Sequence, residues 1–203
     1  MEIILLGDPA AGKATQAKKL SRKFKLIDFD MGEELRKIQF GSGNAKLKKV
    51  LARTYSKGKL TPTWLVRSIL KKGIYAAPKS KGILFDGFPK MFGEARLASK
   101  WLDAAGRNQV YVFYLNIPEK EIIKRMRSRV EVVNGKKIKR TDDNLKAMHV
   151  RIKYFRTGIN KVIEFFSKKY QFKKINGMGS VEAVHQRILK AINEFQAQDQ
   201  RRY

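Results

Sequence analysis

The stretch 1-MEIILLGDPAAGKATQAKKL-20 begins as an apolar strand and passes through a glycine-containing loop into a helical pattern. Within it, Gly7-x-x-x-x-Gly12-Lys13 has the spacing of a phosphate-binding loop between a strand and a helix. In such a loop the glycines let backbone N–H groups turn inward, and the helix N-terminus adds its dipole. We therefore expect phosphate binding here, with a plain strand-to-helix turn and a solvent-exposed lysine as the alternative.

The loop differs from the strict phosphate-loop pattern directly after its lysine. The strict pattern has Ser or Thr directly after the lysine, whereas Ala14 stands there and Thr15 follows it. Ala10 and Ala14 have less conformational freedom than glycine, so the loop is expected to follow a somewhat different path. Thr15 is still expected to contribute to the water shell of a magnesium ion.

The composition is that of a globular chain without cysteine. Its 203 residues, 43% of them hydrophobic, fit one domain with a real core. The absence of cysteine excludes disulfides, thiolate zinc sites and a cysteine nucleophile. Because no stretch reaches the roughly 18 apolar residues of a membrane span, we expect a soluble, cytoplasmic protein without membrane contact.

The charge is strongly positive. Lys and Arg number 45 against 18 Asp and Glu, which gives a formal net charge of +27. Such a field attracts polyanions. The basic residues occur in nearly every segment, however, and this scatter favours solvated basic surfaces with non-specific polyanion binding over a dedicated nucleic-acid site.

Apolar runs alternate with segments of helical spacing along the chain. The expected strands are 2–6, 25–29, 82–86, 109–115 and 171–175. The clearest helical spacing lies within 44–57, 141–167 and 180–195. This alternation predicts an α/β fold with a parallel sheet, in which ligands bind beyond the carboxyl ends of the strands.

Several motifs together resemble the adenylate kinase family of nucleoside monophosphate kinases. Besides the glycine loop they are 29-FDMGEELRK-37, 57-KGKLTPTWLV-66, 83-ILFDGFPK-90, and 125-RMRSR-129 followed by 140-RTDDN-144 and Arg151. The segment 175-INGMGSVEAV-184 is also similar to the family's final strand-to-helix turn. The motifs fall in the family's order and span roughly residues 1–195.

The resemblance implies a P-loop NTPase-like fold, a five-stranded parallel sheet flanked by helices, in one kinase domain over residues 1–203. Its core is expected at 1–30, 62–129 and 140–203, with a nucleoside monophosphate-binding (NMP-binding) insert at 31–61 and a short lid at 130–139. The pair Asn134-Gly135 predicts a tight hairpin turn within that lid. The implied reaction is Mg·ATP + AMP ⇌ 2 ADP in a monomer, by direct in-line transfer.

Phosphoryl transfer between nucleotides needs converging cations and little proton chemistry. The resemblance implies that ATP is held by Arg125, Arg129 and the loop positions Gly7, Ala10, Ala11, Gly12, Lys13, Ala14 and Thr15. It implies that the transferring group is wrapped by Arg129, Arg140 and Arg151. The nucleoside monophosphate is expected at Met31, Gly32, Arg36, Lys59, Thr61, Gly87, Lys90, Glu94, Arg140 and Arg151.

Asp86 is expected to bind magnesium through water, without a direct protein ligand to the metal. The alternative role of this carboxylate is to cap the turn before Gly87. For Asp142 and Asp143 the alternatives are helix capping and orientation of the lid arginines, and the two are compatible.

Three substrate positions depart from the family's pattern. Met31 stands where the family usually has Thr, and Lys90 replaces an arginine and so loses its bidentate fork. Glu94 replaces the glutamine that reads adenine, and a carboxylate only accepts hydrogen bonds. A UMP/CMP kinase therefore stays open as an alternative to an AMP kinase. The altered loop and the high charge leave a further alternative, an RNA- or ribosome-associated NTP-binding protein on the same scaffold.

Overall fold

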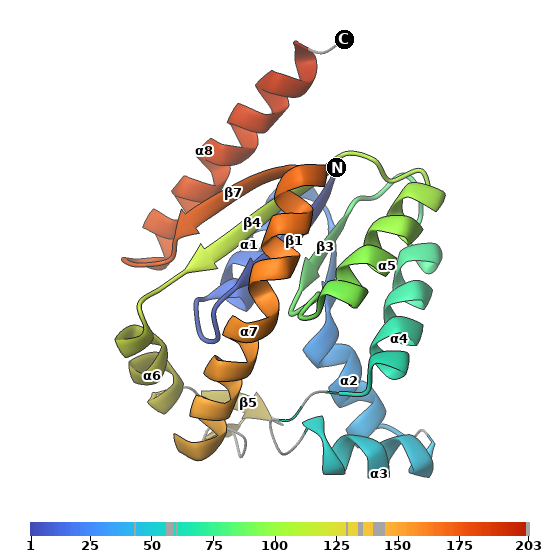
Figure 1. Ribbon diagram of the computed structural model, residues 1–203, viewed down its shortest axis with the longest axis vertical. Coiled ribbons are helices and arrows are strands. Elements are labelled where there is room, and N and C mark those ends of the chain that lie inside the picture. Colours follow the sequence, from blue (N-terminus) through green and yellow to red (C-terminus); the bar gives the residue numbers. More distant parts are fainter. Residues whose placement is uncertain are drawn as a thin grey trace.

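The computed structural model describes residues 1–42, 44–55, 59, 61–128, 130–133, 136–139 and 145–201 of the chain (Figure 1). The strands are β1 (Glu2–Gly7), β2 (Ile27–Asp30), β3 (Ile83–Asp86), β4 (Val110–Asn116), β5 (Val130–Val133), β6 (Lys136–Lys139) and β7 (Gln171–Asn176). The helices are α1 (Lys13–Phe24), α2 (Met31–Phe40), α3 (Ala45–Arg53), α4 (Thr63–Ala76), α5 (Phe92–Ala104), α6 (Glu119–Arg127), α7 (Leu145–Lys169) and α8 (Val181–Gln200). None of the described helices is long and apolar enough to cross a membrane.

Five strands form one parallel sheet in the order β2-β3-β1-β4-β7. All five are the strands expected from the apolar runs, so the predicted fold class is confirmed. β5 and β6 form a separate antiparallel pair, with Val130 opposite Lys139, as expected for a hairpin. The turn pair 134–135 lies outside the described residues.

Helices cover both faces of the sheet, and the alternation of side chains along β1 shows the two cores. Ile4 and Leu6 pack with α2, α4, α5 and α7 on one face. Ile3 and Leu5 pack with α1, α6 and α8 on the other face. Strands buried on both faces are typical of parallel sheets covered by helices, and they explain the continuous apolar runs in the sequence.

The register of the strands brings the candidate site residues to one edge of the sheet. Asp30 at the end of β2 pairs with Asp86 at the end of β3, and Asp86 in turn pairs with Leu5 of β1. Gly7 at the end of β1 pairs with Leu115 of β4. The loops that follow these strands therefore leave the sheet at its carboxyl edge.

A buried ion pair holds the opposite, amino edge of the sheet. The Arg107 guanidinium donates to Glu2 Oε1 at 2.9 Å, and both side chains are 5% exposed. The same guanidinium donates to the backbone carbonyls of Ala77, Pro78 and Lys81. The remaining carboxylate oxygen of Glu2 accepts from the N–H of Ile83. This pair ties β1, the α4–β3 connection and the α5–β4 turn together.

Candidate active site

The glycine loop turns sharply between β1 and α1. Gly7 has φ +153°, and an added Cβ would lie 2.5 Å from the carbonyl oxygen of Leu115. Gly12, which directly precedes α1, has φ +90°. Ala10 also adopts a left-handed conformation, with φ 57°, at a cost of about 1–2 kcal/mol for an L-residue. The loop therefore uses left-handed backbone at a position where this chain has no glycine.

Asp8 anchors this loop to the neighbouring strand, a role that the sequence interpretation missed. Its carboxylate accepts from the Tyr114 hydroxyl and from the N–H of Ile117, both at 3.0 Å. Asp8 is buried, and burial together with this carboxylate raises the pKa of Tyr114. The only sequence signal was an acid within the loop directly after a buried strand.

Lys13 and Asp86 bring opposite charges together below the loop. The ammonium of Lys13 donates to the carbonyl oxygens of Gly7 and Asp8, both at 2.8 Å, so it lies within the curve of the loop. Burial raises the pKa of Asp86 to about 6, and the charge of Lys13 opposes this shift. Asp86 therefore lies close enough to Lys13 for the charge of the lysine to affect its pKa. Within the described residues, no group of three or more His, Cys, Asp or Glu side chains is placed to hold a metal ion.

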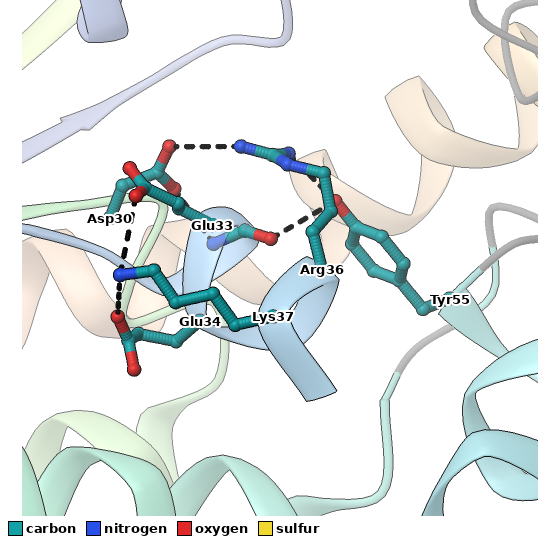
Figure 2. A network of polar contacts seen from close by, with 7 residues as sticks. Asp30, Glu33, Glu34, Arg36, Lys37 and Tyr55 are labelled. Atoms are coloured by element: carbon teal, nitrogen blue, oxygen red, sulfur yellow. Dashed lines mark hydrogen bonds and ion pairs between the residues drawn. The ribbon is translucent and has the colours of Figure 1, made fainter. Parts of the chain in front are cut away.

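Arg36 of α2 lies at the end of the neighbouring strand β2 (Figure 2). Its guanidinium donates to the Tyr55 hydroxyl at 3.1 Å and, at a longer 3.4 Å, to Asp30. Asp30 also accepts from the N–H of Gly32 at 2.7 Å and so caps α2. Tyr55, 19 positions further along the chain, holds the guanidinium of Arg36 in place. The sequence interpretation did not identify this residue.

Glu94 lies buried in the first turn of α5. Its Oε2 accepts from the backbone N–H groups of Lys90 and Met91, at 2.9 and 3.2 Å. The carboxylate therefore caps the helix at the same place where the family resemblance assigns base recognition. Since one oxygen is fixed by two backbone donors, the orientation of the whole carboxylate is fixed.

The other expected nucleoside monophosphate residues differ in exposure. Met31 is buried in the core on the α2 and α4 face, and Thr61 is also buried. Lys59 and Lys90 are exposed. Gly87 directly follows Asp86 and has φ +73°. Met31 thus contributes to packing beneath the expected substrate position.

Arg125 of α6 and the β7–α8 turn meet near the glycine loop. Arg125 donates to Glu121 at 2.6 Å and, at 3.3 Å, to the carbonyl oxygen of Gly177. A Cβ added at Gly177 would lie 3.5 Å from the carbonyl oxygen of Ala11. The structure therefore places Arg125 and the β7–α8 turn, which the family resemblance had predicted, on the same side of the glycine loop.

The remaining expected residues flank the expected lid in the sequence or follow it. Arg129, Arg140, Asp142 and Asp143 lie outside the described residues. Arg151 lies in α7, where the backbone alone is described at this position.

The fold and this edge of the sheet define a class of protein. A parallel sheet whose first strand leads into a G-x-x-x-x-G-K loop, with the lysine ammonium inside the loop and a buried carboxylate on the adjacent strand, is typical of P-loop nucleotide-binding proteins.

Comparisons with known proteins identify the family. The sequence pattern of the family described as "Adenylate kinase" matches residues 5–171. A curated adenylate kinase of Azobacteroides pseudotrichonymphae is 32% identical over 195 residues, covering 96% of this chain and 98% of the relative. Adenylate kinases of Buchnera aphidicola (31% identical, 95% and 97% covered) and Parabacteroides distasonis (28% identical, 95% and 98% covered) are also similar.

The chain belongs to the adenylate kinase family. It is a nucleoside monophosphate kinase, a phosphotransferase with a phosphate group as acceptor.

Proposed function

We propose that this protein transfers the terminal phosphoryl group of Mg·ATP directly to AMP and forms two molecules of ADP. One observation carries the proposal. Lys13 follows β1 and Arg36 follows β2, and β3 with Asp86 lies between these two strands. Two cations that come from either side of one carboxylate suit two phosphate groups that must be held in line.

On the ATP side, the loop from Gly7 to Thr15 supplies backbone N–H groups, and Lys13 supplies charge to the outer phosphates. The guanidinium of Arg125, held beside Gly177, suits stacking on the adenine ring.

Magnesium fits the donor set at this place. Asp86 is a buried carboxylate whose pKa burial raises to about 6, and a dication nearby would compensate its charge. We propose that Asp86 and Thr15 hold the ion through water. When bound, magnesium neutralises charge that develops on the phosphates.

On the acceptor side, Arg36 and Lys90 hold the AMP phosphate. Tyr55 and Asp30 fix the guanidinium of Arg36 from two sides, so little side-chain entropy is lost when the phosphate binds. The hydroxyl of Tyr55 also lies 3.5 Å from the carbonyl oxygen of Gly32, which links this arginine to the start of α2.

Glu94 gives the base preference. Its Oε2 is occupied by two backbone donors, and a carboxylate is an acceptor only, so Oε1 suits a base that presents an amino group. Adenine, cytosine and guanine each carry such an amino donor, whereas uracil has no amino group and offers only its ring N3–H. AMP is therefore expected to be the best acceptor and UMP the poorest, with CMP and GMP between them.

The transferring group completes the proposed mechanism. Arg129, Arg140 and Arg151 stabilise its charge in the transition state. The insert at 31–61 and the lid at 130–139 close over the nucleotides and exclude water, which would otherwise compete as the acceptor. The monomeric state and the cytoplasmic location stay predictions.

A panel of AMP, CMP, GMP and UMP with Mg·ATP tests this function. We expect nucleoside diphosphate formation with AMP to exceed that with UMP by at least tenfold. Transfer to UMP but not to AMP would contradict the role of Glu94, and transfer to none of the four would contradict the kinase itself.

The variant Glu94→Gln isolates the base preference. The amide keeps an acceptor for the Lys90 and Met91 N–H groups and adds a donor that can pair with adenine N1, like the glutamine that the family uses to read adenine. The fold is therefore kept, and the preference for AMP over the other three monophosphates is expected to rise. Glu194→Gln, which makes the same change at an exposed ion pair on α8, is the control and should leave the preference unchanged.

A further inference from the structure

The excess of basic over acidic side chains is not spread evenly along the chain. Residues 35–85 contain 13 Lys and Arg side chains and no Asp or Glu. This span covers α3 and α4, so their cations have no acidic partner close in sequence. The scatter of Lys and Arg along the sequence favoured a surface that is basic everywhere. The positions of Asp and Glu point instead to one region with an excess of positive charge.

The outward face of α4 combines this charge with exposed aromatic rings. Its inward face is buried through Leu65, Val66, Leu70 and Ile74. Trp64, Lys71 and Tyr75 are spaced by seven and four residues on the opposite face, and Trp64 is 56% and Tyr75 50% exposed. Arg67 and Lys72 are exposed on either side of this line. We call Trp64, Arg67, Lys71, Lys72 and Tyr75 the α4 stripe.

Helix α5 lies beside α4 and extends the positive surface (Figure 1). The guanidinium of Arg67 lies next to Gly93 in the first turn of α5. Arg96 and Lys100 are exposed on α5, and Arg96 lies over the exposed ring of Phe92. The α5 acids are engaged elsewhere, because Glu94 is buried and Asp103 pairs with Lys169. Among the described residues, Arg67, Lys71 and Lys72 have no ion-pair partner.

Cations with interleaved aromatic rings suit a strand of phosphates and unpaired bases. Bases stack on aromatic side chains without sequence preference, and Lys and Arg neutralise the backbone. Trp64 and Tyr75 are about 16 Å apart along the helix, with charges between them. A membrane-bound helix needs a continuous apolar face instead, and here Ser68 and Lys71 interrupt it.

We propose that the α4 stripe binds single-stranded nucleic acid on the outward face of α4, away from the glycine loop. The α4 side chains involved point away from the sheet, whereas Lys13 and Asp86 lie at its carboxyl edge. The proposal does not depend on the kinase function.

Fluorescence anisotropy with a labelled 12-nucleotide RNA of mixed sequence tests the proposal, together with DNA of the same sequence and the matching duplex. Both single strands should bind with similar affinity and quench the fluorescence of Trp64, and the duplex should bind more weakly. The variant Lys13→Ala should bind the RNA within about twofold of the wild type, which separates this surface from the cleft. Preference for the duplex would overturn the stacking role.

Two variants test the two components of the α4 stripe. Trp64→Ala with Tyr75→Ala keeps the charge and should weaken binding at least tenfold, since each stacked base contributes about 5- to 150-fold. Arg67→Gln with Lys71→Gln and Lys72→Gln should reduce the slope of log affinity against log salt by about 2. The helix content and melting temperature of each variant, followed by circular dichroism, confirm that it is folded.

A matched control removes the same charge elsewhere. Arg22→Gln, Lys174→Gln and Lys190→Gln change exposed cations on α1, β7 and α8 and should leave the affinity and the salt slope nearly unchanged. Equal weakening by both triple variants would show a diffuse field instead of a site. Unchanged binding by the aromatic variant, or binding to anionic lipid vesicles without binding to the RNA, would also overturn the proposal.

Discussion

The two edges of the central sheet both contain charged residues, but they use them differently. At the amino edge, the guanidinium of Arg107 is neutralised by Glu2 and also donates to three backbone carbonyls. At the carboxyl edge, the ammonium of Lys13 donates to two carbonyls near the carboxylate of Asp86. Arg36 donates to the hydroxyl of Tyr55 and, at a longer 3.4 Å, pairs with Asp30. The cation at the first edge is therefore buried with its counter-charge, whereas Lys13 and Arg36 at the second edge are only partly buried.

This difference separates charges that hold the fold from charges that act on a substrate. A buried ion pair that is also hydrogen-bonded to the backbone does not attract a ligand, but it is costly to break. Partly exposed cations can exchange their contacts with the protein for those of a bound anion and are already oriented for it. Variants at the two edges should consequently affect different measurements.

The largest expected effect is on turnover at the carboxyl edge. Lys13→Ala and Arg129→Ala should each lower kcat about 100- to 1,000-fold, because each removes a charge that stabilises the transferring group. The melting temperature should change little. Lys18→Ala, at an exposed lysine on the same helix as Lys13, is the control and should keep the wild-type rate. Wild-type rates in both site variants would place the site elsewhere.

The next effect is on stability at the amino edge. Arg107→Met should lower the free energy of unfolding by about 3–5 kcal/mol, because Glu2 is left buried without its counter-charge. Adding Glu2→Gln should restore part of this loss. Denaturant unfolding measures both, and the kcat of the folded protein should stay close to that of the wild type. If the folded variant lost kcat, the amino edge would also affect catalysis. That result would contradict the distinction between charges that stabilise the fold and charges that act on the substrate.

A smaller effect is expected within the glycine loop. Ala10→Gly should raise the free energy of unfolding by about 0.5–1 kcal/mol, because glycine adopts the left-handed conformation without strain. Ala14→Gly, in the first turn of α1, should lower it by about 1 kcal/mol, because glycine weakens a helix. Changes of the same sign at both positions would contradict the strain assigned to Ala10.

The smallest effect concerns pH. His185 of α8 is buried against Gln16 of α1, and burial, assisted by Lys19 and Lys23, lowers its pKa, with Glu182 acting in the opposite direction. The unfolded chain therefore binds the proton more tightly, so stability present above about pH 6.5 should be lost as the pH falls below that value. His185→Gln should flatten this dependence, and His149→Gln, at an exposed histidine, should not. An unchanged pH dependence in His185→Gln would contradict this assignment.

Much of the fold could be predicted because its signals are local. The strands of the parallel sheet are buried on both faces, so each appears as a short apolar run, and the glycine spacing marks the loop after β1. Helix boundaries were less accurate. The pattern within 44–57 gave a helix that ends at Arg53, and the pattern within 180–195 gave a helix that continues to Gln200.

The contacts that fix the site could not be predicted in this way because they join distant residues. Asp8 meets Tyr114 and Ile117 only after β1 and β4 pair. Tyr55 reaches Arg36 through the packing of α3 on α2, and Arg107 reaches Glu2 across 105 positions of the chain. Glu94 shows a further limit, because its sequence position suggested base recognition and gave no sign of its second role as a helix cap.

A crystal structure with a bound bisubstrate dinucleotide tests the central claim most directly, because it shows both edges of the sheet at once. We predict that Lys13 exchanges its loop carbonyls for phosphate oxygens and that Arg36 contacts the acceptor phosphate, while Arg107 keeps its hydrogen bonds to Glu2 and the three carbonyls. A dinucleotide bound away from the glycine loop, with Lys13 and Arg36 in their present contacts, would contradict the account.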